Sequence, residues 1–346
     1  MTDPEAARYI LPEEENTRIF REQITPELLS GRETLPTPTL VVLMAQHGAG
    51  KTTTASGVAD VLNKRGGFVD NDSDVYKPYH PQYASLLEED DQRMALYTGP
   101  DGQRWTRQTH DYVLREKVNT LLQETAQSPE FLQGVFSRYG EAGFRREVIG
   151  LGVPLPLSQQ GVFNRYFEQV QERGSGRLPV PEKMERSFQG ILVVAEKIDE
   201  LKLAEQTVVQ RRGPSAPTYA NTRGADGEWK EAPNFRGAIE RERNRPLSNT
   251  EEADFLRTQS KLRQGMGTQW NTALSRIEDL ALPILSHKGQ QAVEKMRSDQ
   301  QRAAAAHIRS TTTGEPAPQK SIAPQAGNPT TGPFRPRPNE GPSRGR

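Results

Sequence analysis

The chain has 346 residues, and its 45 Lys and Arg balance its 45 Asp and Glu, so the formal net charge is zero. No overall field therefore attracts nucleic acid or an anionic membrane to it. The sequence contains no cysteine, which excludes disulfides, thiolate metal sites and a cysteine nucleophile. A hydrophobic fraction of 33% with 26 Pro and 29 Gly indicates one large folded region accompanied by segments that do not pack.

The N-terminus and the longest apolar run indicate where in the cell the protein would be found. The first 15 residues, MTDPEAARYILPEEE, have neither the basic nor the apolar region of a signal peptide. The longest apolar run, residues 40–45, is too short to span a bilayer. We therefore expect a soluble protein without membrane contact, most simply a cytoplasmic one.

Strand-like and helix-like segments alternate along the first two thirds of the chain. The expected strands are 39–45, 67–72, 118–123, 145–153 and 206–211. The expected helices are 13–29, 51 to the stop at Gly66–Gly67, 105–117, 129–142, 159–172 and 181–201. This alternation predicts an α/β fold, an open and mainly parallel sheet flanked by helices.

Composition changes along the chain suggest four regions. Residues 1–38 form an N-terminal helical segment, and residues 39–232 form the sheet-containing domain. From 233 to 309 the pattern is purely helical and highly charged, with a capping box predicted at Ser248 and Glu251. Residues 310–346 are rich in Pro, Gly, Ser and Thr, so we expect a disordered tail.

The segment AQHGAGKT, residues 45–52, lies between the first expected strand and its following helix. It fits the Walker A pattern G-x-x-x-x-G-K-[ST], except that Ala45 replaces the first Gly. Backbone amides of such a loop surround an anion, Lys51 can reach the β- and γ-phosphates, and Thr52 can bind Mg²⁺. The alternative is a Gly-rich turn with a surface lysine, but the strand and helix that flank the loop favour ATP binding. The predicted ATP-binding residues are Gly48, Ala49, Gly50, Lys51, Thr52 and Thr53.

Three aspartates, Asp70, Asp72 and Asp74, follow the second expected strand. In a parallel sheet the carboxyl ends of the strands share one edge, where ligands bind. If the segment stays extended, the three side chains project to the same side. Phosphoryl transfer to an alcohol needs a carboxylate to accept the hydroxyl proton and a metal to neutralise the phosphates. The spacing alone leaves open which aspartate takes which role, and solvated turn residues are the plainer alternative.

The segment DSDVYKPYHPQYASLL, residues 72–87, resembles the D-x-D-x-[FY]-K-x-x-H-P-x-[FY] motif of zeta toxins, the P-loop kinases of bacterial toxin–antitoxin systems. Three further segments resemble the same family in the same order. They are NTLLQETAQ (119–127), GVFNRYFEQVQERGSGRLPVP (161–181) and IERERNRPLS (239–248). The likeness covers roughly residues 12–260.

The resemblance implies a reaction and assigns roles. It implies that ATP phosphorylates the 3′-hydroxyl of the amino sugar in UDP-N-acetylglucosamine, which would poison cell-wall synthesis, and that a small helical antitoxin is the partner. Asp74 would accept the hydroxyl proton, while Lys51 holds phosphate and Asp72 with Thr52 holds Mg²⁺. The transferring phosphoryl group would be neutralised by two arginines, Arg165 and Arg177. An arginine in this role accelerates phosphoryl transfer by about 10³–10⁵-fold.

The acceptor side of the predicted site departs from the family. The family pattern is E-G-T-x-R, whereas this chain has Gln123-Glu124-Thr125-Ala126-Gln127, so the acid is displaced by one place and the arginine is missing. Gln123 or Glu124 would take the acidic position and Thr125 the threonine position. Two other residues, Lys77 and His80, are candidates for the sugar–diphosphate pocket, although His80 before Pro81 fits a turn-stabilising role equally well.

Two other interpretations remain open. One is a P-loop kinase of another hydroxyl, on a small molecule or a nucleic-acid 5′ end, although the neutral charge argues against nucleic acid. The other is a toxin remnant that binds ATP or a protein partner with weak catalysis.

Overall fold

The computed structural model describes residues 6–89, 91–174, 176, 178–179, 181–213 and 216–312. Six strands form one sheet in the order β2-β3-β1-β4-β5-β6. Their bounds are β1 Thr39–Met44, β2 Val69–Asn71, β3 Thr120–Glu124, β4 Arg145–Leu151, β5 Gln206–Gln210 and β6 Tyr219–Thr222. Strands β1 to β5 are parallel, and β6 pairs antiparallel with β5. The predicted α/β fold with a mainly parallel sheet is confirmed.

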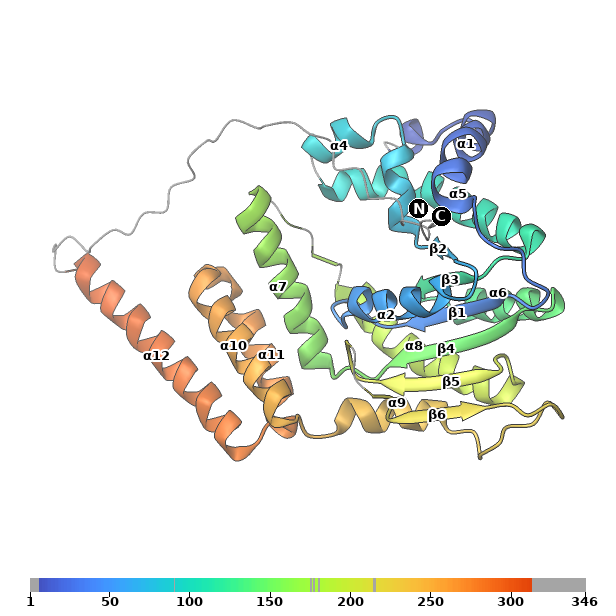
Figure 1. The fold of residues 1–346 in the computed structure, drawn as a ribbon. Coiled ribbons are helices and arrows are strands. Elements are labelled where there is room, and N and C mark those ends of the chain that lie inside the picture. Colours follow the sequence, from blue (N-terminus) through green and yellow to red (C-terminus); the bar gives the residue numbers. More distant parts are fainter. Residues whose placement is uncertain are drawn as a thin grey trace, which may run out of the picture.

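Helices flank this sheet and extend beyond it (Figure 1). The α-helices are α1 Glu13–Ile19, α2 Lys51–Asn63, α3 Ser73–Tyr76, α4 Tyr83–Glu89, α5 Asp91–Glu116, α6 Pro129–Glu141, α7 Leu155–Arg173, α8 Pro181–Leu201, α9 Phe235–Asn244, α10 Asn249–Gly265, α11 Asn271–Ala281 and α12 His287–Thr312. A π-helix, η2 Phe20–Leu29, continues α1, and the short 3₁₀ helices are η1 Ala6–Tyr9, η3 Lys77–Tyr79, η4 Thr268–Trp270 and η5 Leu282–Ile284. No helix in these ranges is long and apolar enough to cross a membrane.

Strand β1 is buried on both faces, which explains why its sequence is continuously apolar. Leu40, Val42 and Met44 belong to the core that α6, α8 and α9 cover. Val41 and Leu43 point to the opposite face and share a second core with α2 and with the helices α10 and α11. Because successive strand residues face opposite sides, one short strand joins both cores.

One predicted helix was much too short, and one strand was missed. Helix α5 begins at Asp91 rather than Trp105 and carries Pro100 inside it. The helix is held by tertiary contacts, among them the hydrogen bonds that Asp101 accepts from Leu11 N at 3.1 Å and Asn16 Nδ2 at 2.7 Å. Strand β6 was not predicted, because its sequence YANT is polar and lies at the sheet edge. The expected disordered tail lies almost wholly outside the described residues, which end at 312.

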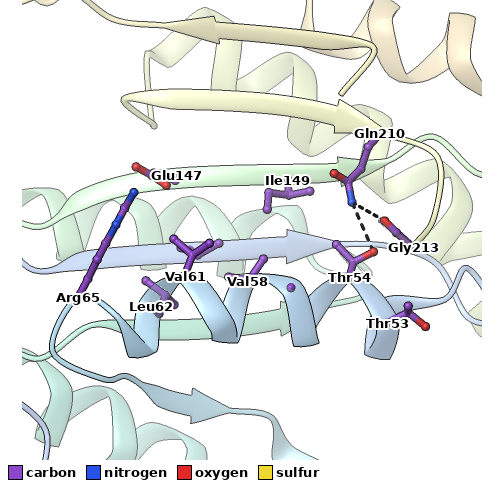
Figure 2. A pocket seen from close by; sticks show the side chains of 12 residues that line it. Thr53, Thr54, Val58, Val61, Leu62, Arg65, Glu147, Ile149, Gln210 and Gly213 are labelled. Atoms are coloured by element: carbon purple, nitrogen blue, oxygen red, sulfur yellow. Dashed lines mark hydrogen bonds between the residues drawn. The ribbon is translucent and has the colours of Figure 1, made fainter. Parts of the chain in front are cut away.

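A cavity of about 270 Å³ lies between α2 and the strands β1, β4 and β5. Figure 2 shows Val58 and Val61 of α2 facing Ile149 of β4, while Gln210 of β5 reaches toward Thr54. The hydrogen bond from Gln210 Nε2 to Thr54 Oγ1 is 3.5 Å long. Aliphatic side chains of α2, β1 and β4 form its middle, so we assign this cavity to the packing between α2 and the sheet.

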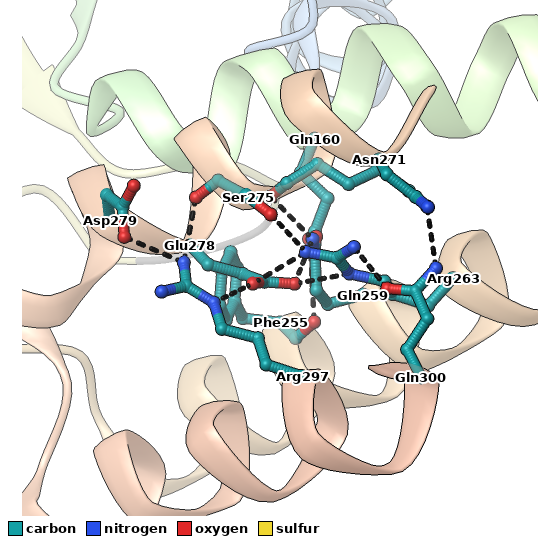
Figure 3. Close-up of polar contacts among 11 residues, drawn as sticks. Gln160, Phe255, Gln259, Arg263, Asn271, Ser275, Glu278, Asp279, Arg297 and Gln300 are labelled. Atoms are coloured by element: carbon teal, nitrogen blue, oxygen red, sulfur yellow. Dashed lines mark hydrogen bonds and ion pairs between the residues drawn. The ribbon is translucent and has the colours of Figure 1, made fainter. Parts of the chain in front are cut away.

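The helices α7, α10, α11 and α12 meet at a buried carboxylate (Figure 3). Glu278 on α11 is fully buried and accepts hydrogen bonds of 2.8 Å from both Nε and Nη2 of Arg263 on α10. Arg297 Nε on α12 donates to the same carboxylate at 2.5 Å, and Gln259 Nε2 donates at 2.9 Å. Gln160 on α7 donates to Gln259 Oε1 at 3.0 Å. Burial raises the pKa of Glu278, but the hydrogen bonds from the two arginines outweigh it and leave the pKa below its usual value.

A buried imidazole on α5 makes the free energy of unfolding depend on pH. His110 Nδ1 lies 2.8 Å from the Tyr139 hydroxyl, and burial lowers the pKa of His110 to about 4. Between pH 6.5 and 4 the unfolded chain then binds a proton that the folded chain does not, so stability falls as the pH falls through this window. We expect His110→Gln to lose less stability than the wild type between pH 7 and 5, measured by urea unfolding. A control, His287→Gln at an exposed position, should follow the wild type. Equal losses in the wild type and His110→Gln would contradict the prediction.

Candidate active site

The predicted phosphate loop joins β1 to the N-terminus of α2. Gly48 and Gly50 have φ of +73° and +86°, conformations that a side chain disfavours. Gly50 is the N-cap of α2, so Lys51 and Thr52 occupy the first turn of that helix, where free backbone amides attract an anion. The Lys51 Nζ donates to Ala45 O at 2.9 Å, which holds the lysine across the loop. The loop therefore has the backbone and side chains that a phosphate cradle requires.

Gly48 also sets how closely the loop approaches α7. A β-carbon at Gly48 would lie 2.0 Å from Ser158 O and 2.8 Å from Val162 N. On the α7 side, a β-carbon at Gly161 would lie 2.4 Å from Gly48 O. All three distances are below van der Waals contact. Helix α7 therefore supports the loop from behind, and only glycine fits at each of these positions.

We expect Gly48→Ala to weaken ATP binding by about 5–150-fold, because the loop must move away from α7 or adopt a strained backbone costing about 1–3 kcal/mol. Isothermal titration with ATP and urea unfolding would measure the two effects. The matched control is Gly57→Ala in the interior of α2, where a β-carbon meets nothing within 4 Å. That variant should keep ATP affinity and gain roughly 0.5–1 kcal/mol in stability. Unchanged ATP binding in Gly48→Ala would contradict the described loop geometry.

The three aspartates do not project to one side as an extended segment would place them. Strand β2 ends at Asn71, and Asp72 becomes the N-cap of α3 by accepting the backbone N–H of Asp74 at 2.9 Å. The expectation of a continuous strand was wrong because this capping bond starts a helix. Asp70 stays on the strand, where Gln123 Nε2 donates to its Oδ1 at 3.3 Å. Asp74 lies on α3 with its side chain 71% exposed and forms an ion pair with Lys77.

Acidic groups from neighbouring strands meet the phosphate loop. Glu124 ends β3 directly beside Met44 of β1, and Ala45 N donates to its carbonyl at 3.0 Å. Burial lowers the pKa of Lys51 to about 8, while the negative charges of Asp72, Glu124 and Asp74 raise it. Burial also raises the pKa of Asp72, and it raises the pKa of Glu124 to about 7. These groups therefore lie within electrostatic reach of one another.

The two candidates for the sugar–diphosphate pocket lie in different settings. Lys77 pairs with Asp74 and its side chain is only 13% exposed. The His80 ring is fully buried, with Nε2 3.0 Å from Tyr9 O and 3.5 Å from Asp101 Oδ2. Its Nδ1 accepts the Gln82 N–H at 3.2 Å. The structure thus places His80 in the packing between the N-terminal segment and α5, which fits the turn-stabilising alternative, and we leave it out of the site proposed below.

Two buried residues beside the loop lie in recognised segments, 45–52 and 239–248, but were not predicted as site residues. Gln46 Nε2 donates to Val153 O at 2.7 Å, and Arg243 Nη2 of α9 approaches Gln46 Oε1 at 3.5 Å. The Arg243 guanidinium lies 3.9 Å from the centroid of the Phe188 ring and donates to Phe188 O at 2.9 Å. Burial lowers the pKa of Arg243 to about 10. The start of the loop is therefore fixed to α8 and α9 as well as to α7.

With this geometry in place, comparison with known proteins identifies the family. The zeta toxin family model matches residues 27–223, which contain the phosphate loop, the acidic strand ends and α7. The chain belongs to the zeta toxin family. Its curated relatives include Toxin zeta of Streptococcus pyogenes and Toxin zeta of Enterococcus hirae, each 22% identical over 140 residues, which are 40% of this chain and 48% of the relative. The matched region spans about half the length of these zeta toxins.

Solved structures share the fold. One describes the PezAT chromosomal toxin–antitoxin system of Streptococcus pneumoniae, with a TM-score of 0.62, 16% identity, and coverage of 74% of this chain and 97% of that chain. Another is the AvrRxo1-ORF1:-ORF2 complex, with a TM-score of 0.51, 15% identity, and coverage of 76% and 87%. At these identities the likeness establishes the fold alone.

Two further predicted positions, Arg165 and Thr125, can be placed on this zeta toxin family member, whereas a third cannot. Arg165 is exposed on α7, and its positive charge lowers the pKa of Lys51, so it lies within electrostatic reach of the loop. Arg177 lies outside the described residues. After β3, Gln127 Nε2 donates to Thr125 Oγ1 at 2.8 Å. The zeta toxin pattern has an arginine where this chain has Gln127, so here an uncharged side chain holds the threonine.

Proposed function

We propose that this chain is an ATP- and Mg²⁺-dependent kinase that phosphorylates the 3′-hydroxyl of the amino sugar in UDP-N-acetylglucosamine and thereby acts as a toxin. The observation that carries the proposal is the position of Lys51 among the acids of two neighbouring strand ends. Lys51 in the loop, Asp72 and Asp74 after β2, and Glu124 at the end of β3 interact electrostatically. A phosphate cradle with carboxylates at the adjacent strand ends is the arrangement that phosphoryl transfer to an alcohol needs.

Each residue then has a role in the proposed reaction. Backbone amides from Gly48 to Thr53 and the Lys51 ammonium hold the donor phosphates. The exposed Asp74 carboxylate accepts the proton of the attacking hydroxyl, while Arg165, together with Arg177, offsets the charge of the transferring phosphoryl group. Lys77, Gln123, Glu124 and Thr125 border the acceptor. In this proposal residues 39–232 form the kinase unit, 1–38 a helical segment, 233–309 a helical extension and 310–346 a tail.

The residues present fit a magnesium ion that is shared with the nucleotide. The Thr52 hydroxyl and the Asp72 carboxylate are the hard oxygen ligands that Mg²⁺ prefers. In the described ranges no group of three or more His, Cys, Asp or Glu could hold a metal by itself, so phosphate oxygens and water would complete the ligand set. When bound, the ion would neutralise charge on the phosphates.

Two parts of the proposal concern the cell. The PezAT neighbour is a chromosomal toxin–antitoxin system, and by analogy we propose a small helical antitoxin as the partner of this chain. We propose the cytoplasm as the location, because the nucleotide-sugar precursors of cell-wall synthesis are made there.

A kinase of another hydroxyl is the second candidate. The altered segment after β3 favours it, because Gln123 is bonded to Asp70 and Gln127 to Thr125. The acceptor therefore meets amides at positions where the family pattern has charged residues.

One experiment separates the candidates. The protein is incubated with ATP, Mg²⁺ and UDP-N-acetylglucosamine, and the sugar nucleotide is examined by mass spectrometry for one added phosphate. Parallel reactions contain other alcohols or a nucleic-acid 5′ end, and Lys51→Ala is the inactive control. Phosphorylation of another acceptor but not of the nucleotide sugar would overturn the first candidate. ATP binding without turnover of any acceptor would instead indicate a catalytically weak toxin remnant.

A further inference from the structure

A second cavity, of about 410 Å³, lies between α7, the end of β5 and α10. Its walls come from α7, from the residues that follow β5, and from α10. The lining residues that matter here are Leu157, Arg211, Arg212, Asp254, Phe255 and Thr258. Neither the family motifs nor the proposed site residues include any of them.

Two lining residues, Arg212 and Leu157, connect the cavity to the phosphate loop. Arg212 Cβ lies 3.5 Å from the position that a β-carbon on Gly50 would take. Arg212 Nη2 donates to Leu157 O at 3.1 Å, and Leu157 precedes Ser158, whose carbonyl lies against Gly48. A ligand that extends from the loop on this side would therefore meet Arg212, which forms the wall of the cavity nearest the loop.

The strand order determines which end of a nucleotide would lie here. In the sheet, β3 and β2 lie on one side of β1, and β4 and β5 lie on the other. The proposed acceptor carboxylate and its acidic neighbours follow β2 and β3, so the γ-phosphate faces that side. The nucleoside at the other end of the triphosphate must then leave the loop toward β4 and β5, where the cavity lies.

The charges around the cavity leave one arginine available to a ligand. Arg211 is buried and forms ion pairs with Glu242 at 3.1 Å and with Glu251 at 3.0 Å. Among the residues that the structure describes, Arg212 has no carboxylate within ion-pair distance, and its buried Nε has no hydrogen-bond partner. A planar guanidinium stacks on aromatic rings, and Asp254 and Thr258 supply hydrogen-bond acceptors for an exocyclic amine.

We propose that this cavity binds the nucleobase of the phosphoryl donor, with the Arg212 guanidinium against the ring and α10 as the far wall. This inference rests on the proposed kinase function and adds the residues that would recognise the base. It also gives α10, which lies beyond the region matched by the family model, a direct part in nucleotide binding.

The test compares ATP with inorganic tripolyphosphate, which has the phosphates but no base. Dissociation constants for both are measured with Mg²⁺ in the full chain and in four variants. Arg212→Ala removes the guanidinium, and Thr258→Phe fills the cavity. Arg276→Ala, at an exposed arginine of α11, and Ala253→Phe, on the exposed face of α10, are the matched controls. Thermal unfolding shows whether each variant folds, and Arg212→Ala alone carries the test if Thr258→Phe does not.

The quantity of interest is the ratio of the tripolyphosphate constant to the ATP constant. Stacking of a base is typically worth about 1–3 kcal/mol, so both cavity variants should lower this ratio about tenfold or more, and the controls should leave it unchanged. A ratio within about twofold of the wild type in the cavity variants, or a wild-type ratio near one, would overturn the inference. Failure of the wild type to bind either ligand would instead refute the kinase proposal itself.

Discussion

Asp74→Asn should abolish phosphoryl transfer while leaving ATP affinity within about twofold of the wild type. A general base contributes about 10²–10⁴-fold to rate, and an amide cannot accept the hydroxyl proton. The change should cost little stability, because Asp74 is 71% exposed and the asparagine amide oxygen can still accept a hydrogen bond from Lys77. Turnover of UDP-N-acetylglucosamine and isothermal titration with ATP measure the two quantities.

Asp72→Asn is the informative companion variant. Asparagine caps a helix as well as aspartate does, so α3 should still form and only the carboxylate charge is lost. If Asp72 is a ligand of the magnesium ion, this variant should weaken the dependence of ATP binding on Mg²⁺. Should Asp74→Asn retain transfer while Asp72→Asn loses it, the two roles would have to be exchanged.

Glu278→Ala should destabilise the protein by about 3–5 kcal/mol, because it leaves the buried Arg263 and the half-buried Arg297 around a missing charge. Urea unfolding at pH 7 measures the loss. The control is Glu294→Ala on an exposed position of α12, which should change stability by less than about 0.5 kcal/mol. A similar unfolding midpoint for both variants would show that the carboxylate does not hold these helices together.

The same carboxylate predicts a pH dependence. The folded pKa of Glu278 lies below its usual value, so its contribution is present above the unfolded pKa and is lost as the pH falls through the folded pKa. The stability difference between the wild type and Glu278→Ala should therefore shrink in acid, below about pH 4.

Local patterns were sufficient to predict most of the sheet and the phosphate loop. A strand buried on both faces must be continuously apolar, and a loop that surrounds phosphate needs glycine at set positions, so 39–45 and GAGKT were recognisable. Strand β6 was missed because an edge strand can be polar. The start of α5 was misplaced because Gly99-Pro100 normally interrupts a helix, whereas here contacts to Asp101 from the N-terminal segment sustain it.

The candidate site was less predictable where it depends on distant partners. His80 resembled a pocket residue, but its ring contacts Tyr9 and Asp101, and no local pattern in the sequence indicates these contacts. Arg212 belongs to no motif, and it becomes noticeable only because the fold places it between Gly50 and α10. The turn at Asp72 had a local signal, since Asp followed by Ser and Asp is a common helix start, but the strand-like run before it obscured that signal.

The close approach of α7 to Gly48 has a consequence for the size of the cooperative unit. One face of α7 touches the phosphate loop, and another is held by α10 and α11 through Gln160, Gln259 and the core around Phe255. The region recognisable as a zeta toxin ends at residue 223, yet a chain cut there would expose this apolar face of α7 to water. The packing that supports the phosphate loop therefore extends beyond the region that the family model matches. Substitutions in α10 and α11 can accordingly shift the phosphate loop without contacting it.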